Sequence, residues 1–120
     1  MSNYGPDMTF LASEDLTGKQ YHLVKLVTAG TVELCDTAGE KAVGVLQNEC
    51  VSGGNAVVRV IGPTKLKVGG TVAAMGYIQA DSDAMGIAAA AADEQLGIFC
   101  EAGADGDIIN AIFNPNGLGV

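Results

Sequence analysis

Residues 43–62, VGVLQNECVSGGNAVVRVIG, contain two short apolar segments that flank a loop ending in two glycines. The segments, VGVLQ (43–47) and AVVRVIG (56–62), are rich in valine, which suits the pleated, half-buried surface of a sheet. Glycine adopts turn conformations that other residues adopt poorly, so Gly53-Gly54 predicts a tight return between the segments. This stretch therefore predicts a β-hairpin.

A second stretch, residues 96–113 (LGIFCEAGADGDIINAIF), repeats the same order of features. An apolar segment with glycine in second place comes first, a loop with Asp-Gly-Asp follows, and a strand-like segment with one polar residue ends it. The spacing from Gly44 to Gly53 equals the spacing from Gly97 to Gly106. Two related hairpins packed in one barrel explain this similarity, and so does the general likeness of one hairpin to another.

Similar strand-like segments continue on both sides, separated by turns rich in glycine, of which the chain has 17. Residues 87–94 (IAAAAADE) fit a short helix or a strand equally well, because alanine favours helix but the run is short. Ten or so short strands predict an all-β fold, a small β-barrel or β-sandwich. The expected strands are 20–28, 31–36, 42–47, 56–62, 64–68, one or two within 71–80, 96–101 and 108–113. The first two of these are expected to form a hairpin.

Segment 20–28 (QYHLVKLVT) is apolar on both faces, with Leu23 and Val27 on one face and Val24 and Leu26 on the other. Such a strand is covered on two sides. Hydrophobic residues make up 48% of the 120 residues and charged residues 17%. A small domain has much surface to cover, so the sequence predicts that partner subunits bury part of this apolar surface.

Residues 1–12 (MSNYGPDMTFLA) predict an extended N-terminal arm, and residues 13–120 a single β domain. The alternative is that the end of this segment is the first strand of the barrel. As an arm, it offers Tyr4, Met8, Phe10 and Leu11 as contacts to a partner surface or a neighbouring protomer. These first residues lack the basic region of a signal peptide, and no apolar run approaches the ~20 residues of a membrane span.

The charge pattern excludes two classes of partner. The net charge is −8, and the six basic residues all lie within residues 1–68, so that residues 69–120 carry acids and no base. Nucleic-acid binding requires a cationic surface, and an anionic membrane repels an acidic protein. We expect no nucleic-acid partner and no membrane partner.

The residues that usually carry chemistry are sparse and scattered. Cys35, Cys50 and Cys100 are an odd, widely spaced set, which predicts free thiols in a reducing cytoplasm and no zinc site. His22 is the single histidine, and no nucleophile-elbow or phosphate-binding loop motif accompanies it. The pairs Asp81-x-Asp83 and Asp105-x-Asp107 fit turns better than a calcium loop. We expect no catalytic residue, no metal, no cofactor and no enzymatic activity.

Six short, glycine-driven motifs lie within residues 20–113. They are Val43–Asn48, Gly53-Gly54, Val58–Gly62, Gly69-Gly70, Asp81–Gly86 and Leu96–Phe113. The order of these motifs resembles the capsid cement, or head-decoration, proteins of tailed bacteriophages.

The resemblance implies a homotrimer that binds the major capsid protein on the outer face of the virion shell and stabilises the expanded head. It also implies production and assembly in the host cytoplasm, and it brings no catalytic residues. Two alternatives remain open. One is another phage structural β protein, such as a tail-tube or fibre-base subunit. The other is a small enzyme or ligand-binding module with a site completed between subunits.

Overall fold

The computed structural model describes residues 7–28, 30–89 and 96–114. These residues form short β-strands and no helix, which confirms the predicted all-β fold, and of the two predicted architectures the structure contains a closed β-barrel. The described residues thus contain no helix that is long and apolar enough to cross a membrane. The strands are β1 (Asp7–Ala12), β2 (Leu23–Thr28), β3 (Thr31–Leu34), β4 (Gly44–Leu46), β5 (Asn55–Arg59), β6 (Gly62–Lys67), β7 (Ile78–Ala80), β8 (Gly86–Ala88), β9 (Gly97–Phe99) and β10 (Ile108–Phe113).

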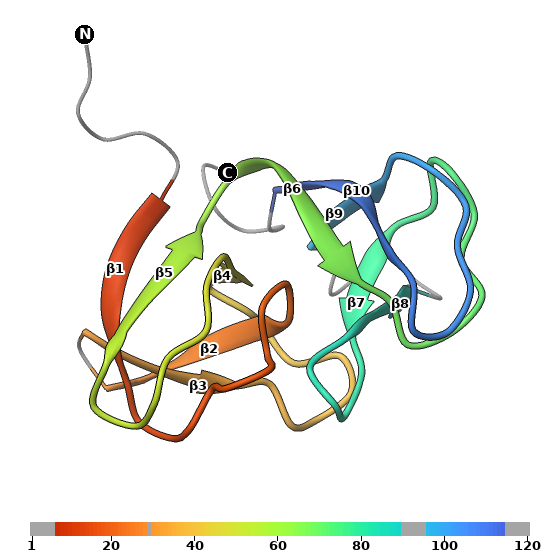
Figure 1. Ribbon diagram of the computed structural model, residues 1–120. Helices are drawn as coiled ribbons and strands as arrows, with labels where there is room; N and C mark the ends of the chain where they lie inside the picture. Colours follow the sequence, from red (N-terminus) through yellow and green to blue (C-terminus); the bar gives the residue numbers. More distant parts are fainter. Residues whose placement is uncertain (1–6, 29, 90–95, 115–120) are drawn as a thin grey trace, which may run out of the picture.

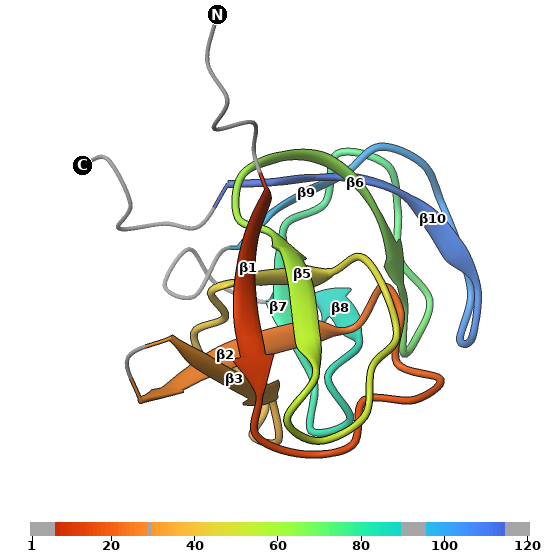
Figure 2. The same cartoon turned by 60° about the vertical axis from the view of Figure 1, so that its left-hand side comes forward.

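The first five strands close into a barrel with the order β1-β3-β2-β4-β5 (Figure 1, left). β1 pairs with β5 in antiparallel fashion and with β3 in parallel, and this closes the barrel. Figure 2 shows β1 and β5 side by side, with β2 and β3 crossing below them. A small barrel is filled by side chains rather than by a ligand. The buried residues of this core are Phe10, Ala12, Leu16, Val24, Val32, Leu46, Ala56 and Val58.

The second five strands lie together beside this barrel (Figure 1, right). They form a three-stranded sheet, β6-β10-β9, and a two-stranded sheet, β7-β8. Two single bridges join these sheets. Tyr77, just before β7, pairs with Ile98 of β9, and Val68, just after β6, pairs in parallel with Gly86 of β8. The resulting order is β6-β8-β7-β9-β10. We call the two units barrel 1 (β1–β5) and barrel 2 (β6–β10).

The two barrels also share their strand register, ladder by ladder. A one-residue slip would turn every side chain of a strand to the other face, so a shared register means shared inside and outside positions. The repeat expected from two hairpins therefore extends over all five strands. In the following list each pair of barrel 1 is followed by its equivalent in barrel 2: Asp7↔Arg59 and Pro63↔Ile112; Val45↔Arg59 and Ile98↔Ile112; Leu23↔Val45 and Tyr77↔Ile98; Val24↔Leu34 and Ile78↔Ala88; Ala12↔Val32 and Val68↔Gly86.

Backbone details outside the ladders repeat as well. Tyr21 and Met75, which occupy equivalent positions before β2 and β7, have positive φ values of 70° and 71°. A non-glycine residue with positive φ is uncommon, so two at one equivalent position indicate the same local path. The Tyr21 amide donates to the Leu46 carbonyl at 2.7 Å, and the Met75 amide to the Phe99 carbonyl at 2.8 Å. Leu46 and Phe99 are themselves equivalent.

A second core joins the two barrels into one body. It combines the interior of barrel 2, including Phe99, with Leu23 and Val45 from the outer wall of barrel 1. Alternate residues of β2 thus enter different cores, with Leu23 in the shared core and Val24 inside barrel 1. The sequence predicted that a partner subunit covers the second apolar face of this strand. At Leu23 the second barrel of the same chain covers that face.

Two segments with open predictions are settled where the structure describes them. Asp7–Ala12 forms β1 of barrel 1, which is the alternative to a free arm, and residues 1–6 lie outside the described residues. Of segment 87–94, the part up to Ala88 belongs to strand β8, and residues 90–94 lie outside the described residues.

Arg59 links the barrels by polar contacts. Its Nε donates to Asp7 Oδ1 at 2.6 Å and its Nη2 to Asp7 Oδ2 at 3.1 Å, a two-pronged ion pair between β5 and β1. Its Nη1 donates to the carbonyl of Pro63 on β6 at 2.6 Å. One half-buried guanidinium therefore fixes the closing ladder of barrel 1 and the first strand of barrel 2.

We expect Arg59→Met to lower the free energy of unfolding by about 1–2 kcal/mol, since it removes charge-assisted hydrogen bonds from a partly exposed site. Arg59→Lys should recover little of this, because lysine cannot make the two-pronged contact. Urea unfolding followed by circular dichroism measures both changes. Lys41→Met, at an exposed lysine, is the control and should be neutral; an equal loss there would contradict the assignment to Arg59.

Candidate functional site

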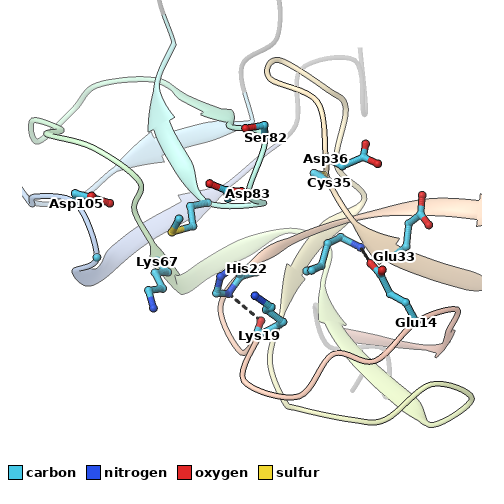
Figure 3. A pocket seen from close by; sticks show the side chains of 13 residues that line it. Glu14, Lys19, His22, Glu33, Cys35, Asp36, Lys67, Ser82, Asp83 and Asp105 are labelled. Carbon is cyan, nitrogen blue, oxygen red and sulfur yellow. Dashed lines mark hydrogen bonds between the residues drawn. The ribbon is translucent and has the colours of Figure 1, made fainter.

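A polar cavity of about 490 Å³ lies where the two barrels meet (Figure 3). Lys19 and His22 line it from the segment before β2, and Lys67 lines it from β6. Asp83 in the β7–β8 turn and Asp105 in the β9–β10 loop complete its acidic side. The cavity thus brings together groups that are distant in the sequence, among them the single histidine.

His22 is fixed to the local backbone at this cavity. It is buried, and its Nδ1 lies 3.1 Å from the Lys19 carbonyl and 3.3 Å from the Gln20 carbonyl. A carbonyl oxygen only accepts, so Nδ1 carries the proton and donates it. Burial lowers the pKa of His22 below its usual value, the hydrogen bonds to the Gln20 and Lys19 carbonyls partly oppose this, and the nearby charges of Lys19 and Lys67 lower the pKa further. The ring therefore holds the local backbone together.

The Cys35 thiol, which also lines the cavity, is not activated. Burial raises the pKa of the Cys35 thiol to about 12, so it stays protonated and unreactive. All three cysteines are free thiols in the structure. No group of three His, Cys, Asp or Glu side chains among the described residues is placed to hold a metal ion.

The two Asp-x-Asp pairs form turns. Asp81 Oδ1 accepts the amides of Asp83 and Met85 at 2.8 and 2.9 Å. Asp107 Oδ2 accepts the amide of Ala104 at 2.9 Å. Such short-range side-chain to backbone bonds are the usual work of aspartate in turns.

We expect the stability of the protein to fall as the pH drops below the usual histidine pKa. Because the folded-state pKa of His22 is lowered, the unfolded state binds more protons there, so this contribution is present above about pH 6.5 and lost below it, with a slope of up to about 1.4 kcal/mol per pH unit. Urea unfolding from about pH 7.5 to about pH 5.5, above the usual carboxyl range, measures it. His22→Gln should flatten the profile; an unchanged slope in that variant would assign the effect to other groups.

The structure separates the four predicted contact residues. Phe10 is 9% exposed and packs in the core of barrel 1, so it is not part of a docking surface. Met8 and Leu11 are 52% and 53% exposed at opposite ends of β1. Tyr4 lies outside the described residues. Met8 and Leu11 therefore remain as candidate contacts, on different parts of the barrel.

Sequence reasoning missed an apolar row on the outer face of barrel 2, which we call the outer row. Its members pair directly across neighbouring strands, from Pro63 on β6 to Ile112 on β10, Ile98 on β9 and Tyr77 beside β7. Residues paired in this way point to the same side of a sheet. Tyr77 is 49% exposed and Ile112 39% exposed. The apolar residues on both faces of segment 108–113 were the signal in the sequence.

A second exposed apolar group surrounds the β2–β3 turn of barrel 1, and we call it the hairpin surface. It consists of Leu11, Leu26 and Val27, all roughly half exposed. Leu11 lies beside the turn because its amide donates to the Gly30 carbonyl at 2.8 Å and it pairs with Thr31. Leu26 and Val27 are successive strand residues and point to opposite sides, so the three side chains flank the turn rather than form one flat face. Large apolar side chains exposed around one turn offer a surface for another protein.

Comparison with known proteins shows a likeness of fold but none of sequence. No protein-family model matches the chain, and no curated protein matches it in sequence. Among solved structures, the chain is similar to the N-terminal base of the head fibre protein gp8.5 of bacteriophage phi29, with a TM-score of 0.72 and 11% sequence identity. The match covers 90% of this chain and 92% of the other. At this identity the likeness establishes a common fold.

Proposed function

We propose that this protein is a structural component of a bacteriophage head, a cement protein that binds the outer surface of the major capsid shell as a homotrimer and stabilises the expanded head. The observation that carries the proposal is the fold shared with the base of a phage head fibre over nine-tenths of the chain. The chain's sequence motifs, which resemble cement proteins, point in the same direction independently.

The surface chemistry supports a protein partner. The described part of the chain exposes two apolar groups, the outer row and the hairpin surface, together with Met8 at the start of β1. Two of the six basic residues, Lys25 and Arg59, are engaged by carboxylates of the same chain. The net charge of −8 gives the chain no overall attraction for nucleic acid, and the proposal includes no catalytic role.

A second candidate within the same class is the base of a head fibre, which the fold likeness favours directly. A fibre base and a cement protein both bind the shell, but they differ in what binding does. A cement protein bridges neighbouring capsomers and resists their separation, whereas a fibre base needs only to be anchored.

Two measurements on empty, expanded heads that lack the protein test the proposal. We expect purified protein to co-sediment with these heads at a saturable stoichiometry, and to raise the temperature at which the heads disrupt. Binding without thermal stabilisation would favour the fibre base. Failure to bind heads of any form would refute both candidates.

The contact to the shell can be localised without unfolding the barrel. Deletion of residues 2–11 would remove most of β1, which closes barrel 1. Deletion of residues 2–6 leaves β1 in place and removes Tyr4, and Met8→Asp alters one exposed side chain. We expect both variants to fold and to bind heads more weakly. Unchanged affinity in both would exclude this end of the chain as the contact.

A further inference from the structure

The contact between the two barrels of one chain has two distinct sides. The outer wall of barrel 1 is one side, where Leu23 and Val45 enter the shared core. The other side is the end of barrel 2 around the β7–β8 turn. The Leu23 amide donates to the Ala84 carbonyl at 2.7 Å, and the Lys67 amide donates to the Tyr21 carbonyl at 3.0 Å. The contact therefore joins a wall to an end, and is not a like-to-like pairing.

The outer row of barrel 2 is the equivalent of this wall. In the shared register, Tyr77 takes the place of Leu23, and Ile98 takes the place of Val45. The wall is continued in barrel 1 by the Arg59–Asp7 ion pair, whereas barrel 2 has Ile112 and Pro63 at these positions. In barrel 1 the Leu23 and Val45 positions of this wall are buried against barrel 2. In barrel 2 the equivalent row is apolar, and its Tyr77 and Ile112 are exposed.

The hairpin surface of barrel 1 is the equivalent of the receiving end. Ala80, at the end of β7, is buried in the shared core, and its carbonyl accepts the Gly39 amide of barrel 1 at 2.8 Å. Its equivalent by register is Leu26, which is exposed. The equivalent of Lys67 is the exposed Leu11. Both free sides of the repeat therefore carry large apolar residues.

We propose that the outer row of one copy docks on the hairpin surface of a second copy, at the place equivalent to the internal barrel–barrel contact. Side chains make this contact, because the Leu11 amide and the Gly30 carbonyl, which are the equivalents of the Lys67 amide and the Ala84 carbonyl, already bond each other. The proposal deepens the homotrimer part of the proposed function and rests on it. Because the two sides differ, the contact is heterologous, and such contacts close into rings when the rotation allows it. Three copies then form a ring of six barrels, in which contacts within chains alternate with contacts between chains.

Single substitutions on each side test this arrangement. Ile112→Lys places a charge in the outer row, and Leu11→Lys places one on the hairpin surface; both side chains are exposed, so the fold of the chain should persist. Val51→Lys, at an exposed residue of the β4–β5 loop on neither surface, is the matched control. Light scattering measures the mass of each purified variant, and circular dichroism verifies that each is folded.

We expect the wild-type protein and Val51→Lys to be trimers, and Ile112→Lys and Leu11→Lys to be monomers. Mixing the two monomeric variants should produce a heterodimer, because one contributes an intact outer row and the other an intact hairpin surface. A trimeric Leu11→Lys variant, a mixture that stays monomeric at every concentration, or a monomeric wild-type protein would overturn the inference. Head binding by the monomeric variants is measured separately, so loss of the ring and failure of the proposed function give different results.

Discussion

Gly97→Ala should destabilise the fold severely. Gly97 lies at the start of β9 with a φ of +146°, a conformation that residues with a side chain adopt poorly. A Cβ atom there would collide with the carbonyl oxygen of Ile112 on β10. Backbone strain and overpacking each cost about 1–3 kcal/mol, so we expect a loss of at least about 3 kcal/mol. That is a large part of the stability of a small domain.

Its equivalent in barrel 1, Gly44, approaches β5 in the same way, since a Cβ atom there would collide with the Arg59 carbonyl oxygen. Gly44→Ala should therefore be similarly damaging, although its φ is not positive. Gly70→Ala is the matched control, because the nearest atom to an added Cβ is Ile87 Cγ2 at 3.9 Å. Urea unfolding of the three variants measures these losses of stability. A stable Gly97→Ala variant would mean that β9 and β10 are not paired as described.

Phe99→Ala should destabilise both barrels together. Phe99 is fully buried in the shared core, and truncation of a buried phenylalanine costs about 3–5 kcal/mol. Leu23 and Val45 of barrel 1 belong to the same core, so a cavity there weakens the outer wall of barrel 1 as well. We expect one cooperative unfolding transition, shifted to much lower urea concentration.

Amide hydrogen exchange distinguishes this from the loss of one barrel. In the Phe99→Ala variant, protection should fall by a similar factor for the slowest amides of β2 and β5 and for those of β6 and β10. Faster exchange confined to residues 62–113, with residues 7–59 unchanged, would show that the barrels unfold independently. Val51→Ala, at an exposed position, should change neither region.

Much of the strand pattern could be predicted because local residue preferences and barrel geometry agree. Segment 108–113 was predicted with the bounds that β10 has, and segments 20–28 and 31–36 do form a hairpin. Alternation along β10 places Ile109, Ala111 and Phe113 in the core and leaves the residues between them exposed. The turn role of the two Asp-x-Asp pairs followed from the same local chemistry.

The full repeat was harder to predict, because barrel geometry preserves register and not residue identity. Arg59 corresponds to Ile112 and Asp7 to Pro63, so an ion pair in one barrel corresponds to two apolar residues in the other. The loops also differ in length, which hides the equivalence of β1 with β6. Only β4–β5 and β9–β10 keep matching glycines, and these are the hairpins whose similarity the sequence showed.

The candidate surfaces depend on contacts that no linear pattern contains. The outer row joins residues from β6, β9 and β10 with Tyr77, and their pairing defines it. Phe10 was a predicted contact because the segment 1–12 was expected to be an arm. Its place in β1 directs its side chain into barrel 1 instead.

Electron cryo-microscopy of heads incubated with the protein tests the proposed cement role. We expect density on the outer face of the expanded shell, at sites between neighbouring capsomers, with three-fold symmetry and room for six small barrels in each unit. The outer row of each chain should face the hairpin surface of the next. Heads without external density after incubation with saturating protein, or density only inside the shell, would contradict the cement role.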